Sequence, residues 1–304
     1  MTGQRKDLAA SVLARLLNRA KQAGDDYQTV LTAYCFERFL YRLGNSGVRD
    51  RFVLKGATLL GIRSDRPYRT TRDLDLLHLG DNSLTTIRED LRAVCATPVP
   101  LDAVRFDADH IRIEPIRVED KYGGTRATLP ASCGTARLAL QIDMGTADSV
   151  WPTPYLSTFP VLLDLPAPEV LVYPRETVVA EKLEAMVVLG DRNSRIKDFF
   201  DLHHLASHFE FDRATLAEAV RRTFTRRRTP IPTEAPIGLT PAYWKNPSRP
   251  AQVRAFARRA GLNVPAETGE EFVPMLGSFL LPLLDDLRRS VPREGLRHPG
   301  GPWQ

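Results

Sequence analysis

The chain has 304 residues, 43% of them hydrophobic, which suits one large folded domain or two moderate ones. Its longest apolar stretches are too short or too charged to span a bilayer, and the charged N-terminal region excludes a secretory signal, so we expect a cytoplasmic protein without membrane contact. Three widely spaced cysteines predict neither a disulfide framework nor a structural zinc site. The net charge of +5 suits an acidic partner such as nucleic acid, but a mildly basic composition explains it equally well.

Two helices are expected at the N-terminus. Apolar residues between Leu8 and Leu43 recur near the helical period, and Gly24-Asp25-Asp26 interrupts them with turn and cap residues. From Phe52 the pattern becomes a short strand, a turn at Lys55-Gly56 and a short helix. Segments of alternating hydrophobicity predict further strands at 73–77, 111–118, 126–129 and 136–143. A helix is expected at 83–95, between the first and the second of these strands.

The second half of the chain is predicted to be helical. A proline-rich stretch at 151–174 cannot hold a helix and marks a linker or a sheet edge. Helices are then expected at 175–189, 196–207, 213–224, 250–260 and 270–290. We therefore predict an α+β protein in which a mixed, largely antiparallel sheet flanked by helices is followed by a helical domain. The expected segments are N-terminal helices at 1–48, the sheet-bearing core at 49–168, a helical domain carrying Lys182 and Asp198 at 169–225, and a proline- and arginine-rich segment with C-terminal helices at 226–304.

Asp73 and Asp75 form the first candidate site. They lie two apart on a predicted strand, so both carboxylates face one side while Leu74 faces the other. Hard oxygen ligands at this spacing suit Mg²⁺, although a bare Asp-x-Asp is more often the solvated end of an edge strand. The preceding strand, glycine and helix favour the metal site, because the turn at Gly56 offers backbone N–H groups to a phosphate.

Asp143 and Lys182 each allow two interpretations. Asp143, on a separate strand, either completes a carboxylate triad or is an acid at the turn before Met144. Lys182 lies in a largely apolar helical stripe and needs a partner. The spacing favours a structural salt bridge with Asp198 or Asp201 over a nucleotide phosphate.

An arginine run follows the predicted helix at 213–224. With Phe224 among them, these arginines suit either a solvated helix end or a patch that contacts an RNA backbone and stacks on a base, and the solvated end is the commoner case. The members of the run are Arg221, Arg222, Arg226, Arg227 and Arg228.

Five segments carry a family resemblance through their joint occurrence and order. They are 52–60, 69–75, 141–145, 173–185 and 193–202. Between about residues 50 and 205 the chain resembles the AbiEii/AbiGii-type nucleotidyltransferase toxins, distant relatives of the polymerase-β-like transferases. In that family the first acid pair binds metal, here Asp73 and Asp75, and the helical lysine and the following aspartate are required for activity, here Lys182 and Asp198. Asp143 corresponds more loosely to the third metal-binding acid of the wider superfamily.

The resemblance implies a nucleotidyltransferase that depends on Mg²⁺ or Mn²⁺. It would transfer a nucleoside monophosphate from an NTP to an RNA acceptor, with the tRNA 3′ end as the expected target, and so block translation as the toxin of a toxin–antitoxin system whose antitoxin is encoded nearby. The residues expected to bind the nucleotide are Lys55, Gly56, Ala57, Thr58, Thr71 and Lys182.

Two expectations concern individual residues of this nucleotide site. Ala57 stands where the family often has Gly or Ser, which leaves the Thr58 hydroxyl or the backbone to serve the triphosphate. Phosphorylation of Thr71 would place negative charge where the triphosphate must lie. Two other functions stay open, a transferase that acts on a small molecule or a protein hydroxyl, and an inactive relative that binds RNA or a partner.

Overall fold

The computed structural model describes residues 2–60, 71, 73–116, 123–146, 148–262, 264–265, 268–291 and 293–304. It divides into two compact units, and the chain passes between them more than once. Unit 1 comprises Met1–Ala147 and Tyr155–Val172, and unit 2 comprises Asp148–Pro154 and Tyr173–Gln304. The boundaries expected at residues 48 and 168 do not coincide with those of the units, because the second N-terminal helix and the strand after residue 168 both belong to unit 1.

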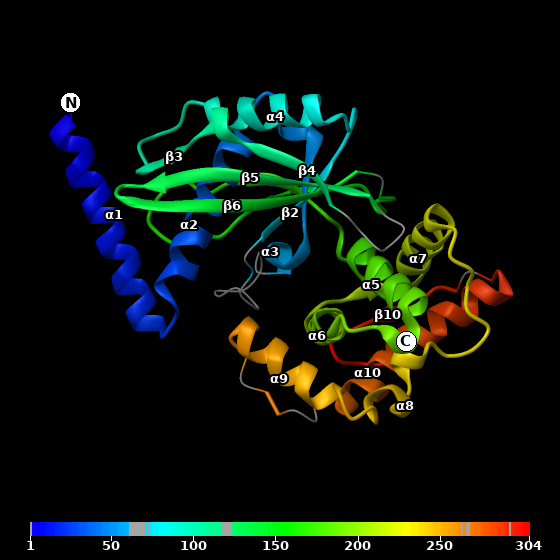
Figure 1. Cartoon of the computed structure of the whole chain (residues 1–304). Coiled ribbons are helices and arrows are strands. Elements are labelled where there is room, and N and C mark those ends of the chain that lie inside the picture. The colour runs from blue at the N-terminus through cyan, green and yellow to red at the C-terminus, as the bar shows by residue number, and fades with distance from the viewer. Residues whose placement is uncertain are drawn as a thin grey trace. The chain divides into compact units, whose positions relative to one another are not determined.

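Unit 1 is built on one mixed sheet (Figure 1). In the described part of the chain it has eight strands in the order β3-β5-β6-β2-β1-β8-β7, with β4 also paired to β5. The pairs β2–β6 and β1–β8 are parallel and the others antiparallel, so the expected mixed, largely antiparallel sheet is confirmed. The strands are β1 Phe52–Lys55, β2 Asp73–His78, β3 Val104–Phe106, β4 Arg112–Ile116, β5 Gly124–Cys133, β6 Ala136–Gly145, β7 Tyr155–Thr158 and β8 Glu169–Val172.

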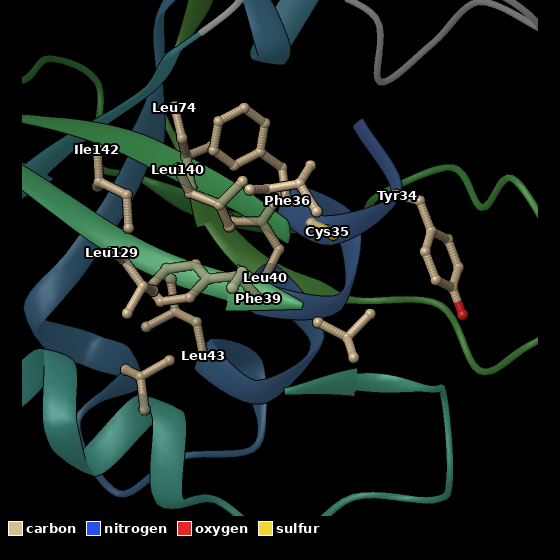
Figure 2. Close-up of a cluster of buried hydrophobic side chains, with 14 of the residues drawn as sticks. Tyr34, Cys35, Phe36, Phe39, Leu40, Leu43, Leu74, Leu129, Leu140 and Ile142 are labelled. Carbon is tan, nitrogen blue, oxygen red and sulfur yellow. The ribbon is translucent and has the colours of Figure 1, made fainter. Parts of the chain in front are cut away.

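Helices bury one face of this sheet. They are α1 Thr2–Ala23, α2 Tyr27–Gly44, α3 Gly56–Leu60 and α4 Leu84–Ala96. The predicted break between α1 and α2 is confirmed, and Asp26 caps α2 by accepting a 2.8 Å hydrogen bond from the Thr29 N–H. Figure 2 shows the apolar face of α2, including Phe36, Phe39 and Leu40, packed against side chains of the sheet. The polar side chains that alternate with these apolar ones along the strands therefore point to the opposite face of the sheet.

The strand that carries Asp73 and Asp75 is anchored at its far end. His78, the last residue of β2, is buried, and its Nε2 lies 2.9 Å from the Asp90 carboxylate on α4. Arg51 donates to the other oxygen of Asp90 at 2.7 Å. This partly buried network fixes β2 to the helix behind it, which gives the acid pair a rigid support.

The proline-rich segment forms an edge of the sheet. This is one of the two roles, linker or sheet edge, that the sequence allowed. β8 pairs in parallel with β1, and β7 pairs with β8 as the last strand of the sheet. Tyr155 and Leu156 of β7 are exposed. Proline is compatible with such an edge because an edge strand leaves part of its backbone N–H groups unpaired.

Unit 2 is helical apart from the short pair β9 Phe211–Asp212 and β10 Leu296–Arg297. Its helices are α5 Arg175–Leu189, α6 Ile196–His208, α7 Arg213–Arg227, α8 Pro241–Trp244, α9 Arg249–Ala260 and α10 Thr268–Arg289. α5 packs against α7, and α10 packs against α6 and α7. The predicted α+β class, a sheet followed by helices, is confirmed. Every helix in the described part of the chain is too short or too polar to cross a membrane.

Candidate active site

Three carboxylates converge on the open face of the unit 1 sheet. The alternation in β2 buries Leu74 and Leu76 and leaves Asp73 and Asp75 partly exposed on the other side. Asp143 on β6 stands in register with Asp75. One oxygen from each of the three acids lies within 4.8 Å of the others. Of the two interpretations of Asp143, the structure therefore supports membership of a triad.

These carboxylates suit a divalent cation. They offer hard oxygen ligands from two neighbouring strands, and three like charges at this separation repel one another unless a cation lies between them. Within the described residues, this is the one group of three acidic, histidine or cysteine side chains whose ligand atoms meet in this way. The residues present thus fit the metal that the sequence predicts.

Neighbouring side chains hold two of the acids in place. Thr71 Oγ1 donates to Asp73 Oδ1 at 2.5 Å, which puts the predicted nucleotide-site threonine against the first acid. Arg126 on β5 forms a fork to Asp143, with Nε and Nη2 each 2.8 Å from one carboxylate oxygen. Gln141 adds a third donor to Asp143 at 3.3 Å. The sequence analysis did not single out Arg126.

Gly56 makes room for the second acid. Its φ of +72° is in the left-handed region, and a Cβ added there would overlap the carboxylate of Asp75. Lys55, the preceding residue, is in register with Asp75 across β1 and β2. The sequence predicted a glycine that exposes backbone to phosphate, and the structure gives this glycine a second role, the close approach of an acidic side chain.

Gly56→Ala should therefore weaken divalent-ion binding at least tenfold and reduce activity, because the new methyl group displaces Asp75. The matched control is Gly24→Ala, at a glycine with the same φ of +72° but with nothing within 4 Å of the added Cβ. Both variants carry the backbone strain of about 1–2 kcal/mol, so the difference between them isolates the overlap. Equal Mn²⁺ affinities in titrations of the two variants would contradict this role of Gly56.

Thr58 follows Ala57 at the start of α3. Its Oγ1 is buried and makes no hydrogen bond within the described residues, and the Ala57 side chain is also buried. That the Thr58 hydroxyl or the backbone of the Gly56 turn serves the triphosphate stays a prediction.

Lys182 lies in a buried ion-pair cluster of unit 2. Its ammonium group donates to Asp198 at 2.8 Å and to Asp201 at 2.7 Å, so it pairs with both of the alternative acids. Arg195 Nε donates to the other oxygen of Asp198 at 2.6 Å. Burial alone would lower the pKa of Lys182, but the two carboxylates outweigh it and raise that pKa. Burial would raise the pKa of Asp198, but Lys182 and Arg195 hold it below its usual range, so this pair is ionised at neutral pH.

The arginine run of α7 is not a uniform surface patch. Arg227 is partly buried and contacts three acids, Glu184 at 2.8 Å, Asp148 at 3.1 Å and Glu181 at 3.6 Å. These acids engage its guanidinium in the folded protein, and its role in RNA binding stays a prediction. Phe224 is also buried and cannot stack on a base from that position.

The other arginines of the run stay on the surface. Arg221 and Arg222 both donate to Glu218, and Arg222 also lies over the Trp151 ring, 3.9 Å from its centroid. Arg226 and Arg228 are exposed. A smaller basic surface therefore remains at this end of α7.

The sheet and its acids define a class of protein. Carboxylates on neighbouring strands that meet at one point are the means by which polymerases hold divalent ions for phosphoryl transfer, and the class is that of the nucleotidyltransferases. The family model described as the nucleotidyl transferase AbiEii toxin of a type IV toxin–antitoxin system matches residues 38–282. The chain belongs to this AbiEii family, and it is a nucleotidyltransferase.

Comparisons with individual proteins find remote likenesses. No curated protein matches the chain in sequence. A candidate nucleotidyltransferase from H. pylori, known as a crystal structure, is 15% identical with a TM-score of 0.46 over 87% of this chain and 98% of its own. The crystal structure of JHP933 from Helicobacter pylori is 14% identical with a TM-score of 0.47 over 87% of this chain and 95% of its own.

Proposed function

We propose that the protein is the toxin of a toxin–antitoxin system and transfers a nucleoside monophosphate from an NTP to an RNA acceptor, with the tRNA 3′ end as the target. The observation that carries the proposal is the convergence of three carboxylates beside the Gly56 turn. Family membership supports the transferase chemistry and the toxin role. Transfer to the 3′ end would block translation because that end must carry the amino acid.

The reaction itself needs little covalent chemistry from the protein. The acceptor hydroxyl oxygen forms a bond to the α-phosphorus, the bond to the β-phosphate oxygen breaks, pyrophosphate leaves, and the hydroxyl proton is lost. Mg²⁺ or Mn²⁺, when held by Asp73, Asp75 and Asp143, would neutralise phosphate charge and align the reacting oxygens. The role of the protein is then to position these acids and the nucleotide.

The remaining residues of the proposed site support the acids and the nucleotide. Thr71 orients Asp73 through its hydroxyl, and its phosphorylation would put about two negative charges beside that carboxylate. Lys55 and the Gly56 backbone are proposed to contact the triphosphate. Lys182 and Asp198 are proposed as residues that transfer requires, as the family resemblance implies.

The proposed RNA surface is the exposed part of the arginine run. It comprises Arg221, Arg222, Arg226 and Arg228, without Arg227, whose side chain is 12% exposed and paired with acids. Exposed guanidinium groups contact phosphates without reading base sequence, so this surface would favour RNA as a class rather than one tRNA. The family implies an antitoxin partner, and we propose that it is encoded next to this protein.

Four parallel incubations test the function. The protein is mixed with total tRNA and one of the four NTPs, each labelled at the α-phosphate, and the RNA is separated from protein and small molecules. Label in tRNA that is removed by trimming the 3′ end supports the proposal. Label in protein or in a small molecule from an added cell extract would support the alternative acceptors, and label in no product with any NTP would indicate an inactive relative.

A further inference from the structure

Charged residues form a row across the open face of the unit 1 sheet. Each of five adjacent strands contributes one residue in register with the next, from β1 through β2, β6 and β5 to β4. In this order the row is Lys55, Asp75, Asp143, Arg126 and Glu114. Both inner acids are thus flanked by a basic residue in the neighbouring strand. Directly opposed residues of neighbouring strands interact, so this row is a single electrostatic unit.

Arg126 contacts both carboxylate oxygens of Asp143 in this row. Both carboxylate oxygens of Asp143 accept a 2.8 Å hydrogen bond from its guanidinium, in the planar fork that matches a carboxylate. An arginine side chain stays protonated in proteins, and this one is paired directly with Asp143. The guanidinium is therefore a permanent positive charge next to the metal-binding acids.

Two features indicate that this contact is part of the site's working state. With Gln141, Asp143 already accepts three hydrogen bonds, and a carboxylate offers about four lone-pair positions, so little capacity is left for cations. The charge of Arg126 and that of a single divalent ion together balance the three carboxylates. Before a nucleotide binds, a second divalent ion would leave an excess of positive charge or would have to displace the fork.

We infer that Arg126 takes the place of a second divalent ion, so that this nucleotidyltransferase holds a single resident ion and uses a fixed guanidinium at Asp143. The inference rests on the proposed metal site at Asp73, Asp75 and Asp143. Arg126 acts by positioning and neutralising Asp143. A protein that depends on one bound ion and one fixed charge responds to metal concentration without the cooperativity of a paired site.

Counting Mn²⁺ ions tests the inference without measuring activity. Purified full-length protein is titrated with Mn²⁺ alone, and the unbound ion is measured by electron paramagnetic resonance. The wild type should bind one ion per chain and Arg126→Met two, because the Asp143 oxygens freed from the guanidinium can bind a further ion. Arg126→Lys should still bind one, since lysine keeps the charge although it lacks the fork. Arg137→Met is the matched control, because this exposed arginine at the start of β6 contacts backbone carbonyls and is expected to leave the count at one.

The outcomes separate this inference from the proposed function. Two ions on the wild type, or one ion on Arg126→Met with an unchanged melting temperature, would overturn the role of Arg126 and leave the metal site standing. A wild type that binds no Mn²⁺ would overturn both. If Arg126→Met does not fold, two other variants decide the question. A second ion bound by Arg126→Lys, or the lack of a second ion on Arg126→Gln, would then overturn the role of Arg126.

Discussion

Asp73→Asn should lower nucleotidyl transfer at least about 100-fold while the protein stays folded. The substitution keeps the size of the side chain and retains an oxygen that accepts from Thr71, so only the charge is lost. Because the three carboxylates repel one another, removing one charge should leave the melting temperature unchanged or raise it.

The measurement is the rate of label transfer together with Mn²⁺ affinity and a melting curve. Asp109→Asn is the control, since Asp109 is an exposed acid of the same unit and makes only a 3.4 Å surface pair with Arg92. Wild-type transfer by Asp73→Asn would refute the site. A large loss of stability would instead show that Asp73 is structural.

Lys182→Ala should destabilise unit 2 by about 3–5 kcal/mol, in addition to any effect on transfer. The lysine side chain is 13% exposed, and Asp198 and Asp201 are 2% and 1% exposed. Its removal would leave Asp201 as a buried carboxylate without this counterion, whereas Asp198 would retain Arg195. Removing one partner of a buried ion pair costs far more than removing one partner of a surface ion pair.

Chemical denaturation monitored by circular dichroism checks this expectation. Lys197→Ala is the control, because Lys197 is an exposed lysine of α6, the helix that carries Asp198 and Asp201, and it should change stability by less than about 0.5 kcal/mol. If Lys182→Ala unfolds at the wild-type midpoint, the ion-pair cluster is not structural. Loss of transfer in a variant that has lost stability says little about catalysis, so transfer must be assayed where the variant is demonstrably folded.

Much of the fold could be predicted because local signals agree with it. The cap at Asp26, the apolar periodicity of α2 and the alternation in β2 each place an element within a few residues of its observed bounds. The parallel pairing of β8 with β1 could not be predicted, because it joins segments more than a hundred residues apart and no local pattern encodes the partner.

The position of Arg126 opposite Asp143 could have been predicted from the register of β5 and β6. Gly134 and Thr135 form the tight turn between β5 and β6, with Cys133 paired to Ala136. Counting back from that turn places Arg126 opposite Asp143. The prediction missed it because the predicted strand ended at residue 129, short of this turn, so the register across the turn was not read.

The partial burial of Arg227 could also have been predicted from spacing. It lies on the helical stripe of Val220 and Phe224, both of which are buried, at offsets of seven and three residues. Because the arginines were treated as one run, the inward-facing position of Arg227 was overlooked. The three acids that surround Arg227 come from distant segments, and only the folded structure brings them to it.

The crossing of the chain between the two units bears on how the enzyme is made. Residues 148–154 belong to unit 2, where the Thr177 hydroxyl donates to the Trp151 carbonyl, yet the chain then returns to unit 1 to add β7 and β8. During synthesis the catalytic sheet cannot be completed until residue 172 has left the ribosome. A nascent chain that already carries all three site acids thus still lacks the two strands that complete the sheet beside them.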